Sequence, residues 1–252
     1  MGTPLRIAVF ECGKAAPGVK AKYGGYGGLF ESHLMAAAKL SNNLAKEDLV
    51  VTKWDVKARE YPKLEDIDAV LMSGSNSDSF ENEPWILQLV EFVKTLLAQR
   101  RVRIIGICFG HQILGRALGA QSGRNNGLWE LGVVEVNLTE TGKEVLGITG
   151  DKLALQQMHQ DVVYTLPPGA INLGWTEKCA FQGFYWPERF LSLQGHPEFD
   201  EEIERECLVR KKDSGLFSAE VYEDAMSKIG DRHDGLTVSK AMLKFLRPEV
   251  ES

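Results

Sequence analysis

The sequence lacks the features that would place the chain in a membrane or direct it across one. No apolar run approaches the length that spans a bilayer, and the N-terminal residues contain no apolar segment of the kind found in signal peptides. Gly2 is not followed by Ser or Thr at the position that a myristoylation signal requires. We therefore expect a cytoplasmic protein that has no membrane partner.

Cysteine is scarce, and basic residues do not outnumber acidic ones. The four cysteines lie far apart and form no CxxC pair, which favours reduced thiols over a disulfide framework or a zinc site. The 29 Lys and Arg residues face 35 Asp and Glu residues, so the net charge is −6 and no basic excess is present to bind a phosphate backbone. We expect no metal, no cofactor and no nucleic-acid partner.

Strand and helix patterns alternate in the first half of the chain. Short apolar runs typical of buried strands occupy 5–10, 49–54, 68–72 and 104–107. Helical spacing of apolar residues occurs at 29–40, at 83–97 and directly after Cys108. Such alternation is typical of βαβ units, which predicts a three-layer α/β fold with a mostly parallel central sheet and flanking helices.

The pattern changes after Gly119. Shorter strand-like segments at 133–138, 153–155, 171–175 and 190–194 predict a small antiparallel extension of the sheet. Helical patterns then fill much of the chain from about 200 to 252. Because no convincing linker divides the sequence, we expect residues 1–252 to form a single domain.

One stretch combines a strand, a sharp turn and a helix around a cysteine. Gly106 and Gly110 bracket Cys108, so that the strand can turn directly into the helix without a clash of side chains. A thiol at that turn lies against the positive end of the helix dipole, which favours the thiolate. A buried structural thiol is the alternative, but the Gly-x-Cys-x-Gly frame favours a nucleophile.

A cysteine nucleophile requires a base, and the base requires a group that orients it. His196 differs from the other four histidines because it follows a predicted strand and has a carboxylate, Glu198, two residues later. Pro197 stiffens the turn between them. The sequence therefore predicts a Cys108–His196–Glu198 triad.

Four segments in this order resemble the class I (triad) glutamine amidotransferase family. They are Met72-Ser73-Gly74-Ser75, the elbow from Gly106 to Gln112, the segment from Met158 to Val163, and Gly195-His196-Pro197-Glu198. Within that family the chain is most similar to stand-alone γ-glutamyl peptidases described from plants and to amidotransferase-like proteins of fungi and bacteria. The family typically has Gly-Gly-Pro where this chain has Ser73-Gly74-Ser75.

The resemblance implies a flavodoxin-like fold and a role for each catalytic residue. Cys108 would attack the carbonyl carbon of a γ-glutamyl group and form a thioester. His196 would protonate the leaving amine and later activate water, while Glu198 orients the imidazole. The backbone N–H groups of Phe109 and Gly74 would form the oxyanion hole.

The resemblance also implies a substrate pocket. Gln112 would hydrogen-bond the substrate, and Gln160 and Asp161 would hold the α-amino and α-carboxylate groups. We expect His111 and His159 to be structural or to support the site from behind, because neither has a carboxylate at a matching spacing.

Two further segments are less specific. Glu130 lies in a Glu-x-Gly segment similar to one that packs near the site in the family, and we assign it no chemistry. The glycine-rich stretch from Tyr23 to Gly28 fits either a substrate-facing loop or a flexible surface loop.

Four functions remain open. The first is a hydrolase of γ-glutamyl amide bonds in glutamine, glutathione or γ-glutamyl peptides and conjugates, favoured because only about fifty residues follow Glu198 and no synthetase domain is present. The second is a glutaminase subunit that delivers ammonia to a separate synthetase partner. The third is a non-enzymatic redox or metabolite sensor that uses Cys108, and the fourth is a general cysteine protease.

Overall fold

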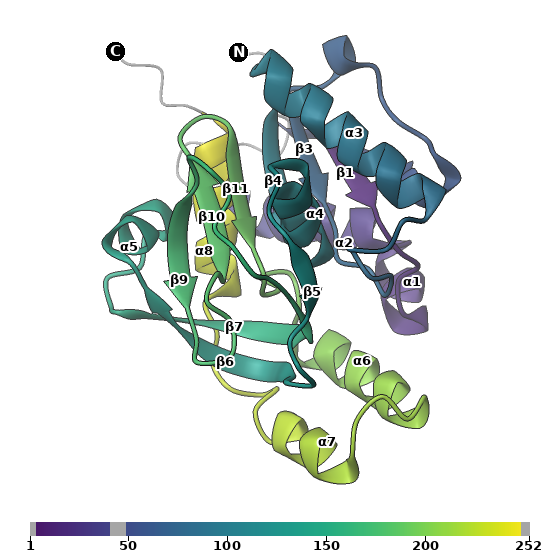
Figure 1. Cartoon of the computed structure of the whole chain (residues 1–252), viewed down its shortest axis with the longest axis vertical. Helices are drawn as coiled ribbons and strands as arrows, with labels where there is room; N and C mark the ends of the chain where they lie inside the picture. The colour runs from purple at the N-terminus through teal and green to yellow at the C-terminus, as the bar shows by residue number, and fades with distance from the viewer. Residues whose placement is uncertain (1–3, 41–48, 248–252) are drawn as a thin grey trace.

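A computed structural model describes residues 4–40 and 49–247 (Figure 1). Within those residues the largest feature is a nine-stranded sheet with the order β2-β1-β3-β4-β11-β10-β9-β6-β7. Its first five strands run parallel. They are β2 (Leu49–Asp55), β1 (Leu5–Glu11), β3 (Ala69–Met72), β4 (Arg103–Ile107) and β11 (Phe190–Leu193).

The other strands extend the sheet in the antiparallel direction. They are β10 (Gly183–Trp186), β9 (Ile171–Trp175), β6 (Glu130–Leu138) and β7 (Lys152–His159). A separate two-stranded sheet pairs β5 (Ser122–Arg124) with β8 (Asp161–Val163). The predicted parallel core and antiparallel extension are confirmed, but the segment at 190–194, predicted to belong to the extension, forms β11 and pairs in parallel with β4.

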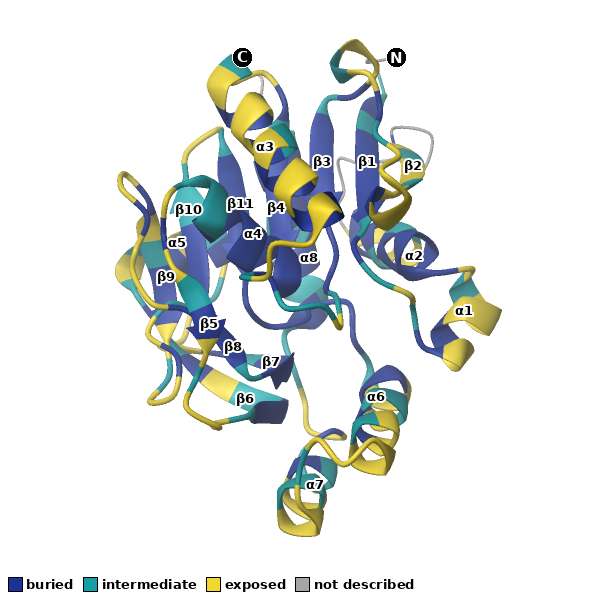
Figure 2. Cartoon of the chain, turned by 45° about the vertical axis from the view of Figure 1, so that its right-hand side comes forward, coloured by how far each residue is buried: buried dark blue, intermediate teal, exposed yellow. Residues whose placement is uncertain are grey.

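Helices cover both faces of the sheet, as the alternation of apolar residues along β1 requires. Ile7 and Val9 belong to a core cluster with α2 (Tyr26–Lys39), α5 (Glu140–Leu146) and α8 (Gly235–Leu246). Ala8 and Phe10 point to the opposite face, which is covered by α3 (Pro84–Gln99) and α4 (Phe109–Ala117). Figure 2 shows four of the five parallel strands, β1, β3, β4 and β11, buried between these helices, whereas the edge strand β2 is largely exposed.

A third core cluster lies beyond the carboxyl ends of the parallel strands. It contains apolar residues of α1 (Pro17–Tyr23), α6 (Glu201–Asp213) and α7 (Ala219–Met226). The carboxylate of Glu206 accepts the Gly18 N–H at 2.9 and 3.1 Å, and Lys22 pairs with Glu202 at 2.8 Å. These contacts attach α6 to α1, and the two helices lie at the same end of the molecule as α7 (Figure 1).

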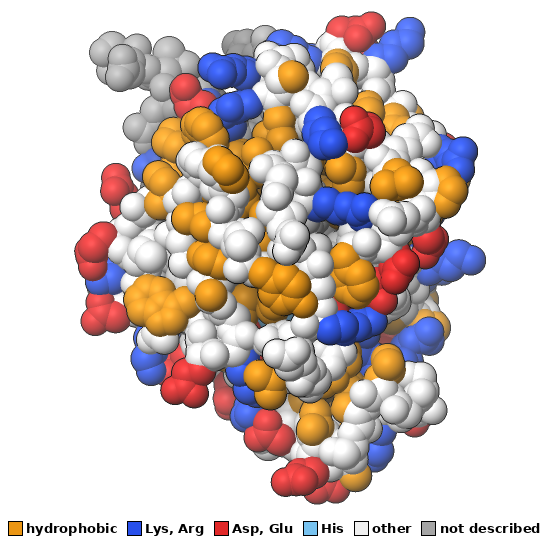
Figure 3. All heavy atoms as spheres, in the orientation of Figure 1, with side chains coloured by type: hydrophobic (Ala, Val, Ile, Leu, Met, Phe, Trp, Pro, Cys, Tyr) orange, Lys and Arg blue, Asp and Glu red, His pale blue; other side chains and the backbone are white. Residues whose placement is uncertain are grey.

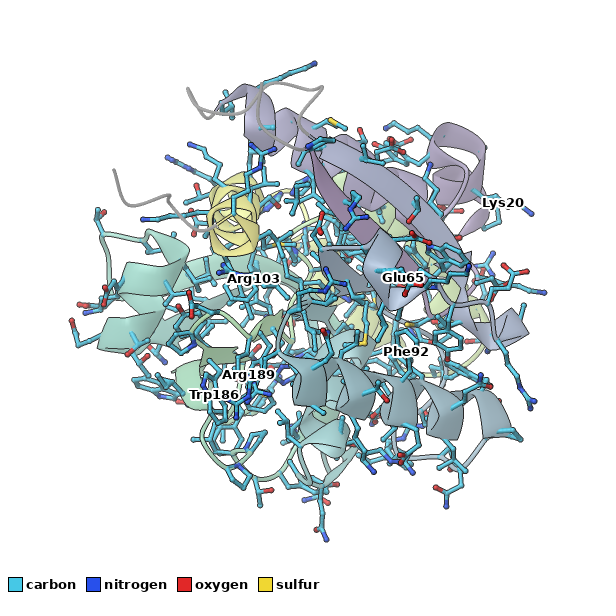
Figure 4. All side chains as sticks on the ribbon, turned by 90° about the horizontal axis from the view of Figure 1, so that it is seen from above. Lys20, Glu65, Phe92, Arg103, Trp186 and Arg189 are labelled. Atoms are coloured by element: carbon cyan, nitrogen blue, oxygen red, sulfur yellow. The ribbon has the colours of Figure 1, made fainter. Side chains whose placement is uncertain are left out.

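The amino end of β11 is fixed on the side of the sheet away from this third cluster. In Figure 4 Trp186 and Arg189 lie together, and the guanidinium carbon of Arg189 is 5.0 Å from the Trp186 ring centroid. This cation–π contact closes the turn between β10 and β11. It holds in place the strand that leads to His196.

On the surface, acidic and basic side chains are interspersed around the face shown in Figure 3. No helix within 4–40 and 49–247 is both long enough and apolar enough to cross a membrane.

The three-layer α/β fold predicted from the sequence is confirmed, and several elements were not predicted. They are α1, α5, β5, β8 and β10, together with two 3₁₀ turns at Val56–Ala58 and Leu64–Asp66. The C-terminal helices end with α8 at Leu246. Residues 248–252, and residues 1–3 to which the predictions about a leader and lipidation apply, lie outside the described residues. The single-domain organisation and the compartment stay predictions.

Candidate active site

Cys108 lies at a strained turn between β4 and α4. Its backbone has φ 53° and ψ −104°, and it caps the N-terminus of α4. A Cβ on Gly106 would lie 2.6 Å from the Gly110 carbonyl oxygen, and one on Gly110 would lie 2.6 Å from the Met72 carbonyl oxygen. Both glycines are therefore required by close backbone packing. A cysteine held at positive φ is costly, which is typical of a functional position.

The predicted base, His196, follows the neighbouring strand, β11. β11 pairs with β4 in parallel register, with Leu193 opposite Ile107, so the chain leaves both strands at the same level of the sheet. The Cys108 N–H donates to the Leu193 carbonyl at 2.8 Å. Three residues after Leu193, the His196 N–H donates to the Gln156 carbonyl at 2.8 Å. These bonds bring together residues that are 88 positions apart (196 − 108).

His196 is oriented by a carboxylate and by an aromatic ring. Its Nδ1 is 2.8 Å from Oε1 of Glu198, and both side chains are almost fully buried. The imidazole stacks on Phe199 with a centroid distance of 4.0 Å. Because Nδ1 is engaged by Glu198, Nε2 is left to act toward Cys108.

The electrostatics of this site favour a charged imidazole. Burial alone would lower the pKa of His196, but the negative charge of Glu198 and the interaction with Cys108 outweigh burial and raise that pKa well above its usual range. An imidazolium next to a cysteine stabilises the thiolate form of that cysteine. Burial raises the pKa of each of the other three cysteines, Cys12, Cys179 and Cys207, to about 12.

Gly74 and Phe109, the residues predicted to form the oxyanion hole, lie on two sides of Cys108. A Cβ on Gly74 would lie 2.9 Å from Cε1 of His196 and 3.7 Å from Cβ of Cys108, so this backbone lies beside both side chains. Ser73 holds the turn, since its Oγ donates to the Gly74 carbonyl at 2.9 Å. Phe109 is the first residue of α4, where the N–H has no partner within the helix.

Two cavities meet at Cys108. We call the first, of about 340 Å³, the glutamyl lobe; Gln112, Arg124, Gln160 and Asp161 are among its lining residues. We call the second, of about 260 Å³, the basic lobe; its lining includes Lys14, Tyr26, Gly74, His196, Arg210 and Lys211. Most of the glycine-rich stretch, predicted to be a loop, is helical: Tyr23 ends α1, Tyr26 begins α2, and only Gly24 and Gly25 form the turn between them. Tyr26 lines the basic lobe, which favours the substrate-facing interpretation.

Arg124 and Asp78 are candidate binding residues that the sequence did not reveal. Nη1 of Arg124 pairs with Asp161 at 2.9 Å, and Nη2 pairs with Asp78 at 2.7 Å. All three residues line the glutamyl lobe. Burial raises the pKa of Asp161; the Arg124 charge opposes that shift and Asp78 adds to it. The lining of the glutamyl lobe therefore includes two carboxyl groups with Arg124 between them, together with Lys211, which it shares with the basic lobe. Such a set of charges is suited to an amino acid.

Gln112 presents only one kind of group to the glutamyl lobe. Its Nε2 donates to the Asp161 carbonyl at 3.0 Å and to Oε1 of Gln194 at 3.1 Å. These bonds use both amide hydrogens, so Oε1 is the atom left for a ligand. We call residues 158–163 the substrate loop. Gln160 in this loop is anchored through its backbone carbonyl, which accepts the Asn125 N–H at 3.0 Å.

The reason given for a structural role of His159 is wrong, because a carboxylate is adjacent to it. Nε2 of His159 lies 3.1 Å from Oε2 of Glu130, and Nδ1 lies 3.1 Å from the Asp161 carbonyl oxygen. The residues are 29 positions apart (159 − 130), but β6 and β7 place them opposite one another. Burial alone would raise the pKa of Glu130, but His159 outweighs it and lowers that pKa. The His159–Glu130 pair therefore supports the substrate loop through the contact between His159 and the Asp161 carbonyl.

His111, predicted to be structural or to support the site, is fully buried and lines neither lobe. Its Nδ1 lies 2.9 Å from Oγ of Ser192, and its ring stacks on Phe184. Burial lowers the pKa of His111 to about 3, so the ring is neutral. In the part of the chain that the structure describes, no group of three or more His, Cys, Asp or Glu residues could hold a metal ion.

Comparison with known proteins identifies the relatives of this arrangement. Residues 35–212 match the family model described as glutamine amidotransferase class-I. An amidotransferase-like protein of Schizosaccharomyces pombe is 31% identical over 95% of this chain and 98% of its own. Gamma-glutamyl peptidase 3 of Arabidopsis thaliana is 30% identical over 88% of each chain.

Solved structures show the same fold. A glutamine amidotransferase from Thermotoga maritima superposes with a TM-score of 0.71 over 100% of both chains at 18% identity. One from Methylobacillus flagellatus gives a TM-score of 0.71 at 20% identity, covering 99% of this chain and 97% of the other.

Proposed function

Because the chain belongs to the class-I glutamine amidotransferase family, we propose that it hydrolyses γ-glutamyl amide bonds with Cys108 as the nucleophile. The observation that carries the proposal is the strained turn that holds Cys108 at the N-terminus of α4, next to the buried His196–Glu198 pair. Similarity to a gamma-glutamyl peptidase along most of the chain supports it.

In the first half of the proposed reaction the amide bond is broken. The Cys108 thiolate attacks the γ-carbonyl carbon, and the developing oxyanion accepts hydrogen bonds from the backbone N–H groups of Phe109 and Gly74. The C–N bond then breaks as the leaving nitrogen takes the proton from Nε2 of His196. The products of this half-reaction are a free amine and a γ-glutamyl thioester on Cys108.

In the second half water replaces the amine. Neutral His196 accepts a proton from the water, and the resulting hydroxide attacks the thioester carbonyl. The C–S bond breaks, glutamate is released, and the thiolate and imidazolium are both restored. Glu198 holds the imidazole in one orientation and stabilises its charged form in both halves.

The glutamyl lobe supplies the binding groups for this substrate. We assign the α-carboxylate to Arg124, and the α-ammonium to Asp78 and Asp161 with Oε1 of Gln112. An α-ammonium would then replace part of the contact between Asp161 and the arginine. Gln160, on the loop that lines this lobe, is placed to contact the same end of the substrate.

The test is release of glutamate, measured by mass spectrometry, from a γ-glutamyl dipeptide and from glutamine. We expect release by the natural chain, none by Cys108→Ala and normal release by Cys179→Ala, a control thiol that lines neither lobe. A γ-glutamyl chloroketone should label Cys108 alone, because the other three cysteines are held protonated by burial. Labelling spread over several cysteines, or release by Cys108→Ala, would contradict the mechanism.

A further inference from the structure

The two lobes that meet at Cys108 differ in charge. We propose that the basic lobe binds a carboxylate on the leaving group, so that the preferred substrates are γ-glutamyl compounds whose amine carries a negative charge. The inference rests on the hydrolase function proposed above. It assigns the residues that distinguish such a substrate from glutamine, whose leaving group is ammonia.

Charge is the first observation. Lys14, from the segment between β1 and α1, lines the basic lobe together with Arg210 and Lys211 of α6. None of its fifteen lining residues is Asp or Glu, although the chain has a net charge of −6. Within residues 4–40 and 49–247 neither Lys14 nor Arg210 forms an ion pair. The cavity therefore offers positive charge without internal neutralisation.

The orientation of α6 is the second observation. Basic residues in the last turn of a helix often only complement its dipole, and α6 has three of them. However, two carboxylates of this helix are already engaged by α1: Glu202 forms an ion pair with Lys22, and Glu206 accepts a hydrogen bond from the Gly18 N–H. Lys14, which belongs to neither helix, also lines the basic lobe. The helix dipole does not account for a cation from a separate segment.

The position of His196 is the third observation. His196 lines the basic lobe and not the glutamyl lobe, whereas Gln112, Gln160 and Asp161 line only the glutamyl lobe. In an amide hydrolysis the proton donor must face the leaving nitrogen. A substrate with its glutamyl end in the glutamyl lobe therefore directs its amine past His196 and into the basic lobe.

A size argument agrees with this placement. Ammonia makes no use of a cavity of about 260 Å³, whereas an amino acid or a short peptide fills part of it and brings a carboxylate close to Lys14 and Arg210. We expect a discrimination of at least about tenfold in kcat/KM.

The test compares γ-glutamylglycine with γ-glutamylglycinamide and glutamine on the full chain. The two dipeptides differ only in the charge of the leaving group. The natural chain should favour the free carboxylate about tenfold in kcat/KM, mainly through KM. In the double variant Lys14→Gln, Arg210→Gln this preference should collapse, with kcat/KM for γ-glutamylglycine falling to the level of its amide.

A matched control removes the same charge elsewhere. Lys20, at the outer edge of the molecule in Figure 4, lines neither lobe, and Lys20→Gln should retain the tenfold preference. Equal kcat/KM for the two dipeptides in the natural chain would overturn the inference, as would a preference that survives in the double variant or a preference for glutamine. Those results leave the hydrolase function standing, whereas no release from any of the three substrates would reject both proposals.

Discussion

Replacing Glu198 by Gln is the most direct probe of the catalytic geometry. The substitution keeps the length and shape of the side chain, and its amide oxygen can still accept a hydrogen bond from Nδ1 of His196. What it removes is a full negative charge 2.8 Å from the imidazole, in a place where both side chains are at most 5% exposed. The variant therefore isolates charge stabilisation from orientation.

The expected effect is large because the charge is buried. Removing one partner of a buried ion pair costs about 3–5 kcal/mol, since the other charge is left uncompensated. That corresponds to a fall in kcat/KM of about 10²–10⁴-fold. Glu204, the other carboxyl group near the imidazole, cannot substitute for Glu198 at neutral pH because burial raises its pKa to about 8.

The pH profile gives the sign of the effect. Glu198 raises the pKa of His196, so its removal must lower that pKa, and the alkaline limb of the profile should move to lower pH. The assay is glutamate release from a γ-glutamyl dipeptide across a pH series. Glu201→Gln is the control, since this exposed residue pairs with Arg205 on the surface of α6. A Glu198→Gln variant with kcat/KM and pH profile close to those of the control would refute the triad.

Two further predictions concern the backbone and the second His–Glu pair. Gly74→Ala should lower kcat about 10²-fold without unfolding the protein, because the added Cβ would lie 2.9 Å from His196 and displace an oxyanion donor; unchanged kcat would contradict this role of Gly74. Glu130→Gln should raise KM for a γ-glutamyl dipeptide about tenfold and change kcat little, because it weakens the support that His159 gives to the Asp161 carbonyl. A fall in kcat at constant KM would place Glu130 in the chemistry instead.

The fold and the turn around Cys108 could be predicted because their signals are local. Gly106, Cys108 and Gly110 occur within five residues at the end of a strand, and both glycines are required by the close packing of the turn. The contact between His196 and Glu198 could also be predicted locally, since it spans only two positions. The elements that were missed have weaker patterns. β10 contains four residues beginning with glycine, and α1 is a short helix that ends where the glycine-rich stretch begins.

The rest of the site could not be read from the sequence because its contacts are long-range. Arg124 was not selected because nothing near it in the chain marks it as a ligand; its partners are 46 and 37 positions away. Glu130 and His159 were each noted and then assigned no joint role, since only the pairing of β6 with β7 shows that they face one another. The sequence shows that Arg124, Glu130 and His159 are present, but the residues that they contact are determined by the register of the strands.

The pairing of β4 with β11 has a consequence for how the protein acquires its reactivity. A ribosome completes the elbow around Cys108 well before it delivers the strand that carries His196, because 82 residues separate the end of β4 from the start of β11 (189 − 107). Until that strand docks, the cysteine has neither its base nor the Leu193 carbonyl that holds its backbone. We therefore expect reactivity at Cys108 to arise only after β11 has docked beside β4.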